Sequence, residues 1–122
     1  MNIEQFREYC LHKKGVTEEF PFDENTLVFK VMGKMFALSG LEHIPNEINL
    51  KCDPERAIEL REAYNGLIYG GYHMNKKHWN TLVIERLPND LIMELIDHSY
   101  DLVVTNLPKR LKAEIQLLNN RI

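Results

Sequence analysis

The chain has 122 residues, of which 44% are hydrophobic and 27% are charged. This length and composition are typical of one globular domain with a single core and exclude a disordered chain, so we expect residues 1–122 to form one domain. The formal net charge of −3 argues against a protein that binds nucleic acid over its whole surface, although a local basic patch is compatible with it.

The N-terminal segment predicts an amphipathic helix. Asn2 is a suitable N-cap and Gly15 is a suitable stop. The apolar side chains that recur between them at helical spacing are Ile3, Phe6, Cys10 and Leu11. Charged residues interrupt this segment, so it does not read as a secretion signal, and no stretch approaches the roughly 20 apolar residues of a membrane span. We therefore expect a cytoplasmic protein without a membrane segment.

Three strands are expected next. Residues 26–32 (TLVFKVM) are rich in β-branched and aromatic side chains, Gly33 and Lys34 supply a tight turn, and residues 35–41 return as the second strand of a hairpin. Alternation then marks residues 47–52 as a third strand. Its apolar side consists of Ile48, Leu50 and Cys52, opposite Asn49 and Lys51.

The second half of the chain predicts three helices and one strand. Residues 53–66 predict a helix, because an Asp–Pro pair suits its start and an Asn–Gly pair suits its end. Residues 81–85 (TLVIE) predict a strand, and another helix begins at residues 88–90. The β-branched side chains within residues 101–106 leave open whether that helix continues through them. A last helix begins at Pro108.

The expected order is therefore helix, three strands, helix, loop, strand and two helices. Regular alternation of strands and helices is missing, which argues against a doubly wound parallel sheet. We expect an α+β fold in which helices pack against an antiparallel β-sheet.

The sequence carries no recognisable catalytic or metal-binding motif. It lacks a GxSxG elbow, a P-loop and a glycine-rich dinucleotide turn. Cys10 and Cys52 lack the spacing of a zinc knuckle or a disulfide framework, so we expect two reduced, buried thiols. His43, His73 and His78 do not form an HExxH pattern. We therefore expect no enzymatic activity, no metal and no cofactor.

Several segments, taken in chain order, resemble the MmcQ/YjbR family. They are Pro21–Phe22, VFKVMGKMFAL at 28–38, NLKCDPE at 49–55, GYHMNKKHWNT at 71–81, SYDLV at 99–103 and LPKRL at 107–111. Together they span nearly the whole chain. The resemblance implies a CyaY-like α+β fold and the double-wing mode of DNA binding proposed for that family. It implies no catalytic residue and no cofactor.

The run from residue 72 to residue 80 gathers aromatic, basic and amide side chains. Lys76 and Lys77 can neutralise phosphates, and Asn75 can donate to a phosphate or to a base edge. Trp79 can stack on an exposed base. A second interpretation is also open, in which the aromatic side chains belong to the core and the polar ones hold the loop by hydrogen bonds.

A second basic group comes from the predicted strands and consists of Lys30, Lys34 and Lys51. Lys30 and Lys51 alternate away from the more apolar side, so the three lysines could share one sheet surface and lie along phosphates. In the other interpretation they are solvent-facing residues that prevent strands from aggregating. The basic residues at the start of the last helix are likewise either phosphate contacts or a solvated helix face; they are Lys109, Arg110 and Lys112.

The leading hypothesis is a DNA-binding protein that contacts phosphates through lysines, with Asn75 setting the register. The lysines are Lys30, Lys34, Lys76 and Lys77. Neutralising about four phosphates predicts that the logarithm of the binding constant falls with the logarithm of the salt concentration at a slope of about −3.6. The alternative is a non-catalytic protein–protein interaction module that uses the same sheet face or loop. The acidic net charge and the aromatic, amide-rich loop favour this alternative.

Overall fold

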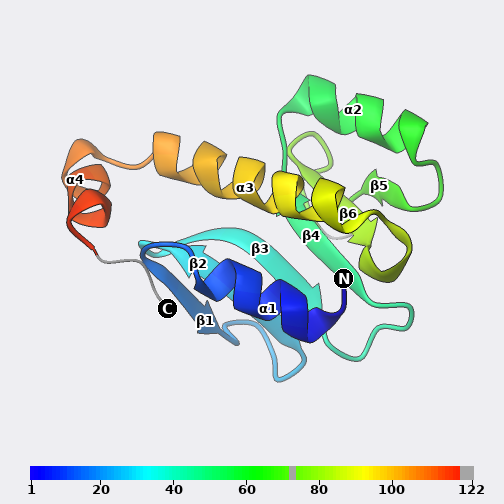
Figure 1. Ribbon diagram of the computed structural model, residues 1–122, viewed down its shortest axis with the longest axis horizontal. Helices are drawn as coiled ribbons and strands as arrows, with labels where there is room; N and C mark the ends of the chain where they lie inside the picture. Colours follow the sequence, from blue (N-terminus) through cyan, green and yellow to red (C-terminus); the bar gives the residue numbers. More distant parts are fainter. Residues whose placement is uncertain (72–73, 119–122) are drawn as a thin grey trace.

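The computed structural model describes residues 1–71 and 74–118 (Figure 1). Its helices are α1 (Ile3–Leu11), α2 (Pro54–Ala63), α3 (Asn89–Thr105) and α4 (Lys109–Leu117), and a short 3-10 helix η1 spans Ile84–Arg86. Its strands are β1 (Val16–Glu19), β2 (Thr26–Val31), β3 (Lys34–Gly40), β4 (Glu47–Lys51), β5 (Ile68–Gly70) and β6 (Trp79–Val83).

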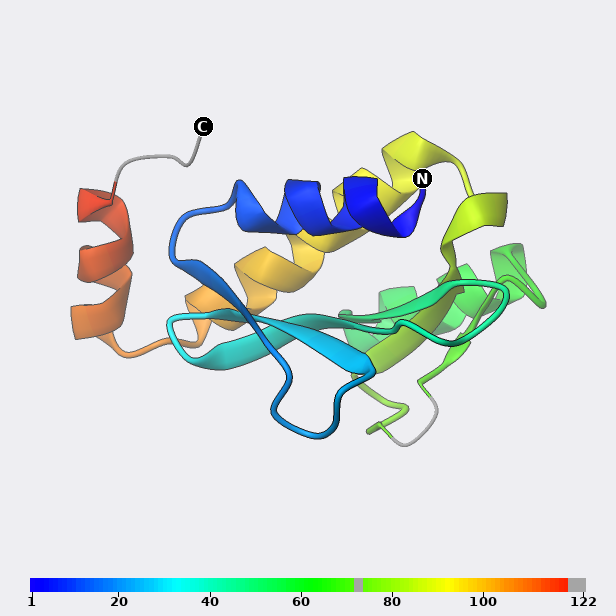
Figure 2. The same ribbon diagram turned by 90° about the horizontal axis from the view of Figure 1, so that it is seen from below.

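The six strands of the described residues form one sheet in the order β1-β2-β3-β4-β6-β5. Every pair of neighbouring strands is antiparallel. Figure 2 shows α1 and α3 on the same side of this sheet. On that side α3 crosses β3 and β4, α1 packs on β1, and α2 packs on β5. The predicted α+β fold, an antiparallel sheet with helices packed against it, is confirmed.

The structure has two strands that the sequence analysis does not predict, β1 and β5. Only Val16 of β1 is fully buried, and β5 is three residues long and ends in a glycine. Neither segment is long enough to display an alternating pattern. Both lie at the edges of the sheet, where the backbone of a neighbouring strand supplies the pairing.

Several strand boundaries differ from the sequence prediction because of strand pairing. Met32 and Gly33 are the central residues of the β2–β3 turn, with φ of +49° and +84°, and Lys34 already belongs to β3. Positive φ at both positions is typical of a type I′ turn, whose twist suits a hairpin. Strand β6 begins at Trp79 because Trp79 and Asn80 pair with β4.

Helix α3 continues through the segment that the sequence left open. It ends at Thr105, and Val103 near its end is 5% exposed. Packing of this side chain against the sheet outweighs the weak helix preference of β-branched residues.

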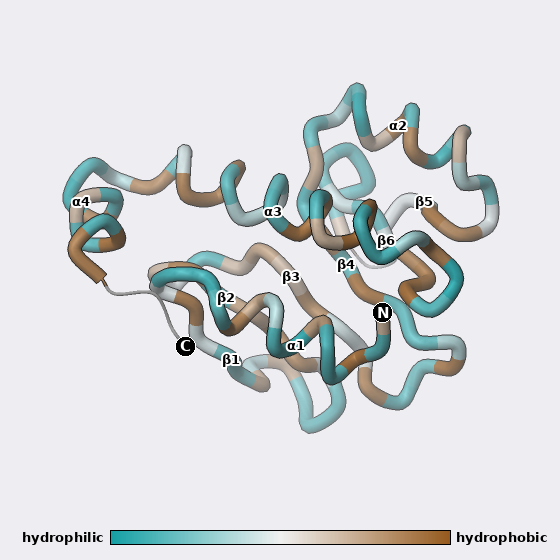
Figure 3. The backbone as a smooth tube through the Cα atoms, viewed as in Figure 1, coloured by the Kyte–Doolittle hydropathy of each residue, from teal (hydrophilic) through white to brown (hydrophobic). Residues whose placement is uncertain are grey.

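The main core lies between the sheet and the helices. The β2 side chains Leu27, Phe29 and Val31 belong to it, as their alternation predicts. Phe6 of α1 meets Phe29 edge to face, with ring centroids 5.4 Å apart. Figure 3 shows hydrophobic and hydrophilic stretches alternating along α1 and α3, as expected for helices with one buried side.

Two helices begin as their sequences predict. The Asn2 side chain accepts the backbone N–H of Gln5 at 2.8 Å, and the Gln5 side chain accepts the N–H of Asn2 at 3.0 Å. At α2, Asp53 Oδ2 accepts the N–H of Arg56 at 3.1 Å, and Pro54 is the first helical residue. These contacts satisfy N–H groups that a helix start leaves without partners.

The hydroxyl of Ser99 connects α3 to two strands. A shift in register between β2 and β3 leaves Phe36 without a partner on β2. The Ser99 hydroxyl donates to the carbonyl of Phe36 at 2.5 Å and accepts the N–H of Lys51, at the end of β4, at 2.9 Å. Ser99 has no exposed surface, so it satisfies two backbone groups at a site without bulk water.

Ser99→Ala is expected to lower the free energy of unfolding by about 2–6 kcal/mol, because it leaves two buried backbone groups unpaired and each costs about 1–3 kcal/mol. Urea denaturation measures this change. Thr105→Ala, at an exposed position of the same helix, serves as the control. A difference of less than roughly 0.5 kcal/mol between the two variants would contradict the proposed role of the hydroxyl.

Both cysteines are buried free thiols. Cys10 has no exposed surface and Cys52 is 4% exposed. Burial raises the pKa of the Cys10 thiol above its usual range, and burial raises the pKa of Cys52 to about 11. Since the thiolate is the nucleophile, neither side chain is placed for thiol chemistry near neutral pH.

The folded chain is expected to react with Ellman's reagent at mildly alkaline pH much more slowly than the chain unfolded in guanidinium chloride. Unfolding exposes both sulfur atoms and returns each thiol to its ordinary pKa. The absorbance of the released thiolate follows the reaction. One rapidly reacting thiol in the folded chain would show that burial does not protect it.

Candidate functional site

One face of the sheet carries no helix in the described part of the chain, and we call it the open face. Figure 2 shows the segments around 20–25 and 74–78 extending on this side, away from α1 and α3. The strand register places the following side chains on it: Thr26, Val28, Lys30, Leu38, Glu47, Asn49, Lys51, Trp79 and Thr81.

Two of the lysines predicted from the strands, Lys30 and Lys51, both lie on the open face. Lys30 Nζ is 3.4 Å from Glu19 Oε1, and its side chain is 25% exposed. Lys51 pairs in register with Trp79 and makes no ion pair within residues 1–71 and 74–118. The cation of Lys51 is therefore more available to a ligand than that of Lys30.

Lys34 lies apart from these two lysines. It is exposed at the start of β3 and is paired with Val31. Cross-strand partners point to the same side of a sheet, and Val31 belongs to the main core. The structure thus places Lys34 on the helix side of the hairpin end and does not bring all three lysines to one surface.

Asn75 organises the loop before β6. Its Oδ1 accepts the N–H of Lys77 at 3.0 Å, and its carbonyl accepts the N–H groups of His78 and Trp79 at 3.1 and 2.9 Å. These bonds agree with the interpretation in which the amide holds the loop. The Asn75 amide nitrogen has no hydrogen-bond partner in the described residues, so it can still donate to a ligand.

Lys76 and Lys77 are exposed beside that amide. The backbone of Lys76 is held by Arg61 of α2, which donates to its carbonyl and also to Asn80 Oδ1 at 2.7 Å. Neither lysine makes an ion pair with any residue that the structure describes. The loop is therefore fixed at its base while its two ammonium groups face solvent.

Trp79 is 8% exposed and packs with Val28 and Leu38 in a small second cluster on the open face. Met35 and Met74 cover its edges. A ring buried to this extent offers little surface to a base, which favours the interpretation of Trp79 as a packing residue.

The end of β4 and the loop meet although they are far apart in the sequence. The N–H of Cys52 donates to the carbonyl of His78 at 2.7 Å, which continues the β4–β6 pairing beyond Trp79. Lys51 and His78 line one hollow of about 240 Å³ at this place. Lys51 thus lies beside the segment that carries Lys76 and Lys77, and we call these three residues the basic group.

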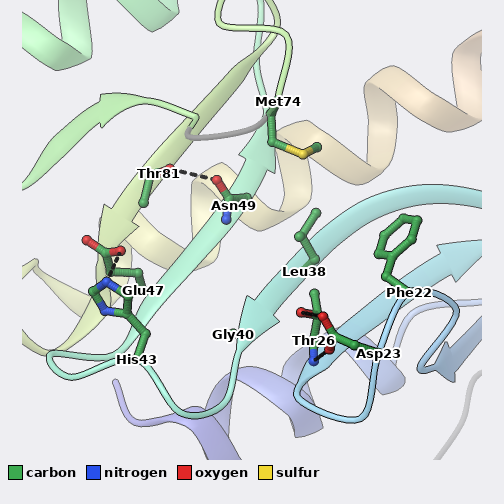
Figure 4. A pocket seen from close by; sticks show the side chains of 10 residues that line it. All are labelled: Phe22, Asp23, Thr26, Leu38, Gly40, His43, Glu47, Asn49, Met74 and Thr81. Carbon is green, nitrogen blue, oxygen red and sulfur yellow. Dashed lines mark hydrogen bonds and ion pairs between the residues drawn. The ribbon is translucent and has the colours of Figure 1, made fainter.

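A pocket of about 440 Å³ opens on the open face (Figure 4). The loop between β1 and β2 contributes Phe22 and Asp23 to it, and the loop before β6 contributes Met74. The remaining lining residues are Thr26, Leu38, Gly40, His43, Glu47, Asn49 and Thr81.

Hydrogen bonds fix the polar side chains of this pocket. The Thr81 hydroxyl donates to Asn49 Oδ1 at 2.6 Å. His43 Nε2 is 3.2 Å from Glu47 Oε1, and its Nδ1 is 2.8 Å from the carbonyl of Pro45. Both ring nitrogens of His43 lie within hydrogen-bonding distance of an oxygen, so the ring is held from two sides.

Asp23 lies at the mouth of the pocket with its oxygens occupied. Oδ1 accepts the N–H groups of Asn25 and Thr26 at 2.8 and 2.7 Å, and Oδ2 accepts the Thr26 hydroxyl at 3.2 Å. The hydrogen bonds from Asn25 and Thr26 hold the pKa of Asp23 below its usual range. This carboxylate therefore shapes the loop and keeps its negative charge.

The sequence analysis does not identify this pocket. The sequence does contain a signal for the polar face that the pocket occupies. Polar residues at alternate positions mark one face of a strand, and here they are Glu47, Asn49 and Lys51 on β4, with Thr81 on β6. The alternation alone does not reveal which loops wall that face. His43 and Phe22 join the pocket from loops whose positions depend on the whole fold.

Other kinds of site are less well supported by the geometry. Across residues 1–71 and 74–118, no three His, Cys, Asp or Glu side chains are grouped so that they could hold a metal ion. In the same residues, no helix combines the length and the apolar character that crossing a membrane requires. Tyr72 and His73, which the sequence places in the candidate loop, lie outside the described residues.

Comparison with known proteins finds relatives along most of the chain. It is 32% identical over 120 residues to the uncharacterised protein YjbR of Escherichia coli K12, covering 96% of this chain and 100% of that one. It is 43% identical over 93 residues to the uncharacterised protein YbdF of Escherichia coli O157:H7, covering 75% of each.

Solved structures and a family model agree with these relatives. The crystal structure of Deinococcus radiodurans protein DR2400 matches with a TM-score of 0.88 and 39% identity, covering 98% of this chain and 91% of that chain. A crystal structure of a Pseudomonas syringae protein matches with a TM-score of 0.71 and 31% identity, covering 84% and 98%. The model of the YjbR family matches residues 11–102. The chain therefore belongs to the YjbR family, the MmcQ/YjbR family that its sequence segments resemble.

Proposed function

We propose that this chain is a DNA-binding protein that contacts phosphates through the basic group Lys51, Lys76 and Lys77. The observation that carries the proposal is the backbone hydrogen bond from Cys52 to His78, which joins the two distant segments that carry these lysines. Asn75 supplies a further N–H donor next to them. Ammonium and amide groups of this kind are the usual partners of phosphate oxygens.

The charge distribution explains how an acidic chain can bind a polyanion. The net charge is −3, but acidic side chains already neutralise other cations. Arg7 pairs with Glu18 at 2.5 Å, Lys13 pairs with Asp97 at 2.5 Å, and Arg56 pairs with Glu94. The basic group has no such partner in the described residues, so its field acts on a ligand.

Lys51 replaces Lys30 in the set of phosphate contacts because Lys30 faces Glu19. Trp79 is left out because it is buried, and Lys34 because it lies on the other side of the sheet. We infer binding rather than catalysis, since both thiols are buried. Two unpaired cysteines also suit a reducing compartment, and we propose that the protein acts in the cytoplasm.

Exposed apolar side chains on two joined loops favour a second candidate function, protein–protein interaction. Phe22 is 67% exposed and Ile44 is 91% exposed. Their loops are joined by the bond from the N–H of Leu41 to the carbonyl of Asn25, at 2.7 Å. Apolar side chains grouped on a surface in this way often mark an interface. A pull-down from nuclease-treated lysate separates the two functions, because partners held through DNA are then lost.

Binding of random-sequence duplex DNA is expected to weaken with salt. Three phosphate contacts predict a slope of about −2.7 for log K against log salt concentration, and Lys76→Ala with Lys77→Ala is expected to reduce the slope to about −0.9. Fluorescence anisotropy over a series of salt concentrations gives both values.

The matched control removes the same charge elsewhere. Lys109→Ala with Arg110→Ala changes two exposed cations at the start of α4 and is expected to leave the slope unchanged. A slope near zero for the unmodified chain would rule out the phosphate contacts. Equal losses in the two double variants would show that only overall charge matters.

A further inference from the structure

The open-face pocket is separate from the basic group and presents different chemistry. Its lining includes the carboxylates of Asp23 and Glu47 and the imidazole of His43, but neither lysine nor arginine. Such a lining offers no ammonium or guanidinium group to a phosphate. It suits an uncharged ligand that can donate hydrogen bonds to a carboxylate.

Strand β4 offers a donor and an acceptor side by side in this pocket. Because the Thr81 hydroxyl occupies Asn49 Oδ1, the Asn49 amide nitrogen points away from Thr81 into the pocket, as Figure 4 shows. Glu47 is two residues earlier and on the same face, and the ion pair with His43 uses only its Oε1. A ligand that accepts a hydrogen bond from Asn49 and donates one to Glu47 along the same edge satisfies both side chains.

The walls of the pocket suit a flat ligand. Leu38 and Met74 supply apolar surface, and the Phe22 ring lies at the rim with 67% of its surface exposed. An exposed ring can stack on a planar heterocycle without first leaving a packed core. The volume of about 440 Å³ lies within the range of small-molecule sites.

We propose that the open-face pocket binds a single unpaired nucleobase, with guanine preferred. Guanine carries two neighbouring N–H donors, which one carboxylate can accept, next to a carbonyl oxygen that can accept from Asn49. Adenine offers one donor on the corresponding edge, so it makes one hydrogen bond fewer with the Glu47 carboxylate than guanine does. The base must be unpaired, since pairing occupies the same edge.

The position of Lys51 connects this site with the proposed DNA binding, on which the inference rests. Glu47, Asn49 and Lys51 are alternate residues of β4 on one face, about 6.8 Å apart. Lys51 is therefore the cation of the basic group that lies nearest along β4 to a base held by Glu47 and Asn49. The ligand is a base of single-stranded DNA or a free nucleotide, which share this chemistry.

The first test is titration of the ¹⁵N-labelled full chain with deoxyguanosine, which has no phosphate, followed by NMR. We expect shifts at β4 and around Phe22, and binding about tenfold or more tighter than that of deoxyadenosine. Glu47→Gln and Phe22→Ala are each expected to weaken deoxyguanosine binding about tenfold. Phe22 is exposed, so its variant is expected to fold even if the Glu47 variant does not.

Two controls separate the site from general charge effects. Glu42→Gln removes an exposed carboxylate that does not line the pocket and is expected to leave binding unchanged. Lys51→Ala is expected to weaken deoxyguanosine monophosphate but not deoxyguanosine. If Phe22→Ala lowers the affinity for a single-stranded oligonucleotide, the site binds DNA. If that affinity is unchanged, the site binds free nucleotides.

The outcomes for the pocket and for the proposed function are distinguishable. Salt-dependent binding of duplex DNA without any binding of deoxyguanosine would overturn the nucleobase site and leave the phosphate contacts standing. If deoxyguanosine binding needs Glu47 and Phe22 but duplex DNA does not bind, the nucleobase site is supported. The proposed binding of duplex DNA is then wrong. Equal binding of deoxyguanosine by the Glu47→Gln and Glu42→Gln variants would overturn the nucleobase site.

Discussion

The contact of Ser99 with the sheet is the interaction on which the arrangement of the molecule depends. A register shift in the β2–β3 hairpin leaves the carbonyl of Phe36 without a strand partner. At the end of β4, the N–H of Lys51 donates to the Ser99 hydroxyl and not to a strand. One buried hydroxyl satisfies both groups and so fixes the longest helix across the centre of the sheet. Any other position of α3 would leave these backbone groups unpaired in the core. The side chains of α1, α2 and α4 that join the same core extend this layer.

The open face is the consequence of that one-sided layer. A sheet with helices on one side buries its apolar side chains there and exposes the opposite side to water. On that side, Val28, Leu38 and Trp79 form only a small apolar cluster. The polar positions of β4 and β6 are therefore free to line a pocket between two loops. The candidate chemistry of the protein lies where the fold does not need side chains for its stability.

The basic side chains of this protein differ in whether another residue of the chain already binds them. Some arginines and lysines hold elements together: Arg61 holds the loop before β6, and Lys13 lies between Asp97 and the rings of Tyr9 and Tyr100. The lysines of the basic group have no comparable role in the described residues. The fold thus places three cations without an ion pair in the described residues near one end of β4, and the Glu47 carboxylate in the pocket further along that strand. A ligand with a charged and an uncharged part can use both.

The sequence by itself determined the class of fold, the helix starts at Asn2 and Asp53, the hairpin of β2 and β3, and the burial of Cys10 and Cys52. Each of these follows from local patterns: a capping residue, an alternation of apolar side chains, or a turn that needs positive φ. The exposure of Lys76 and Lys77 also agrees with their local sequence. Only the tertiary structure decided the edge strands β1 and β5, because so short a strand forms only where a neighbouring strand offers its backbone. It also decided that Lys51 rather than Lys34 lies beside the loop, that Trp79 is buried, and that Phe22, His43 and Asn49 share a pocket. These outcomes depend on strand register and on the packing of distant loops, and no local pattern encodes which segments meet.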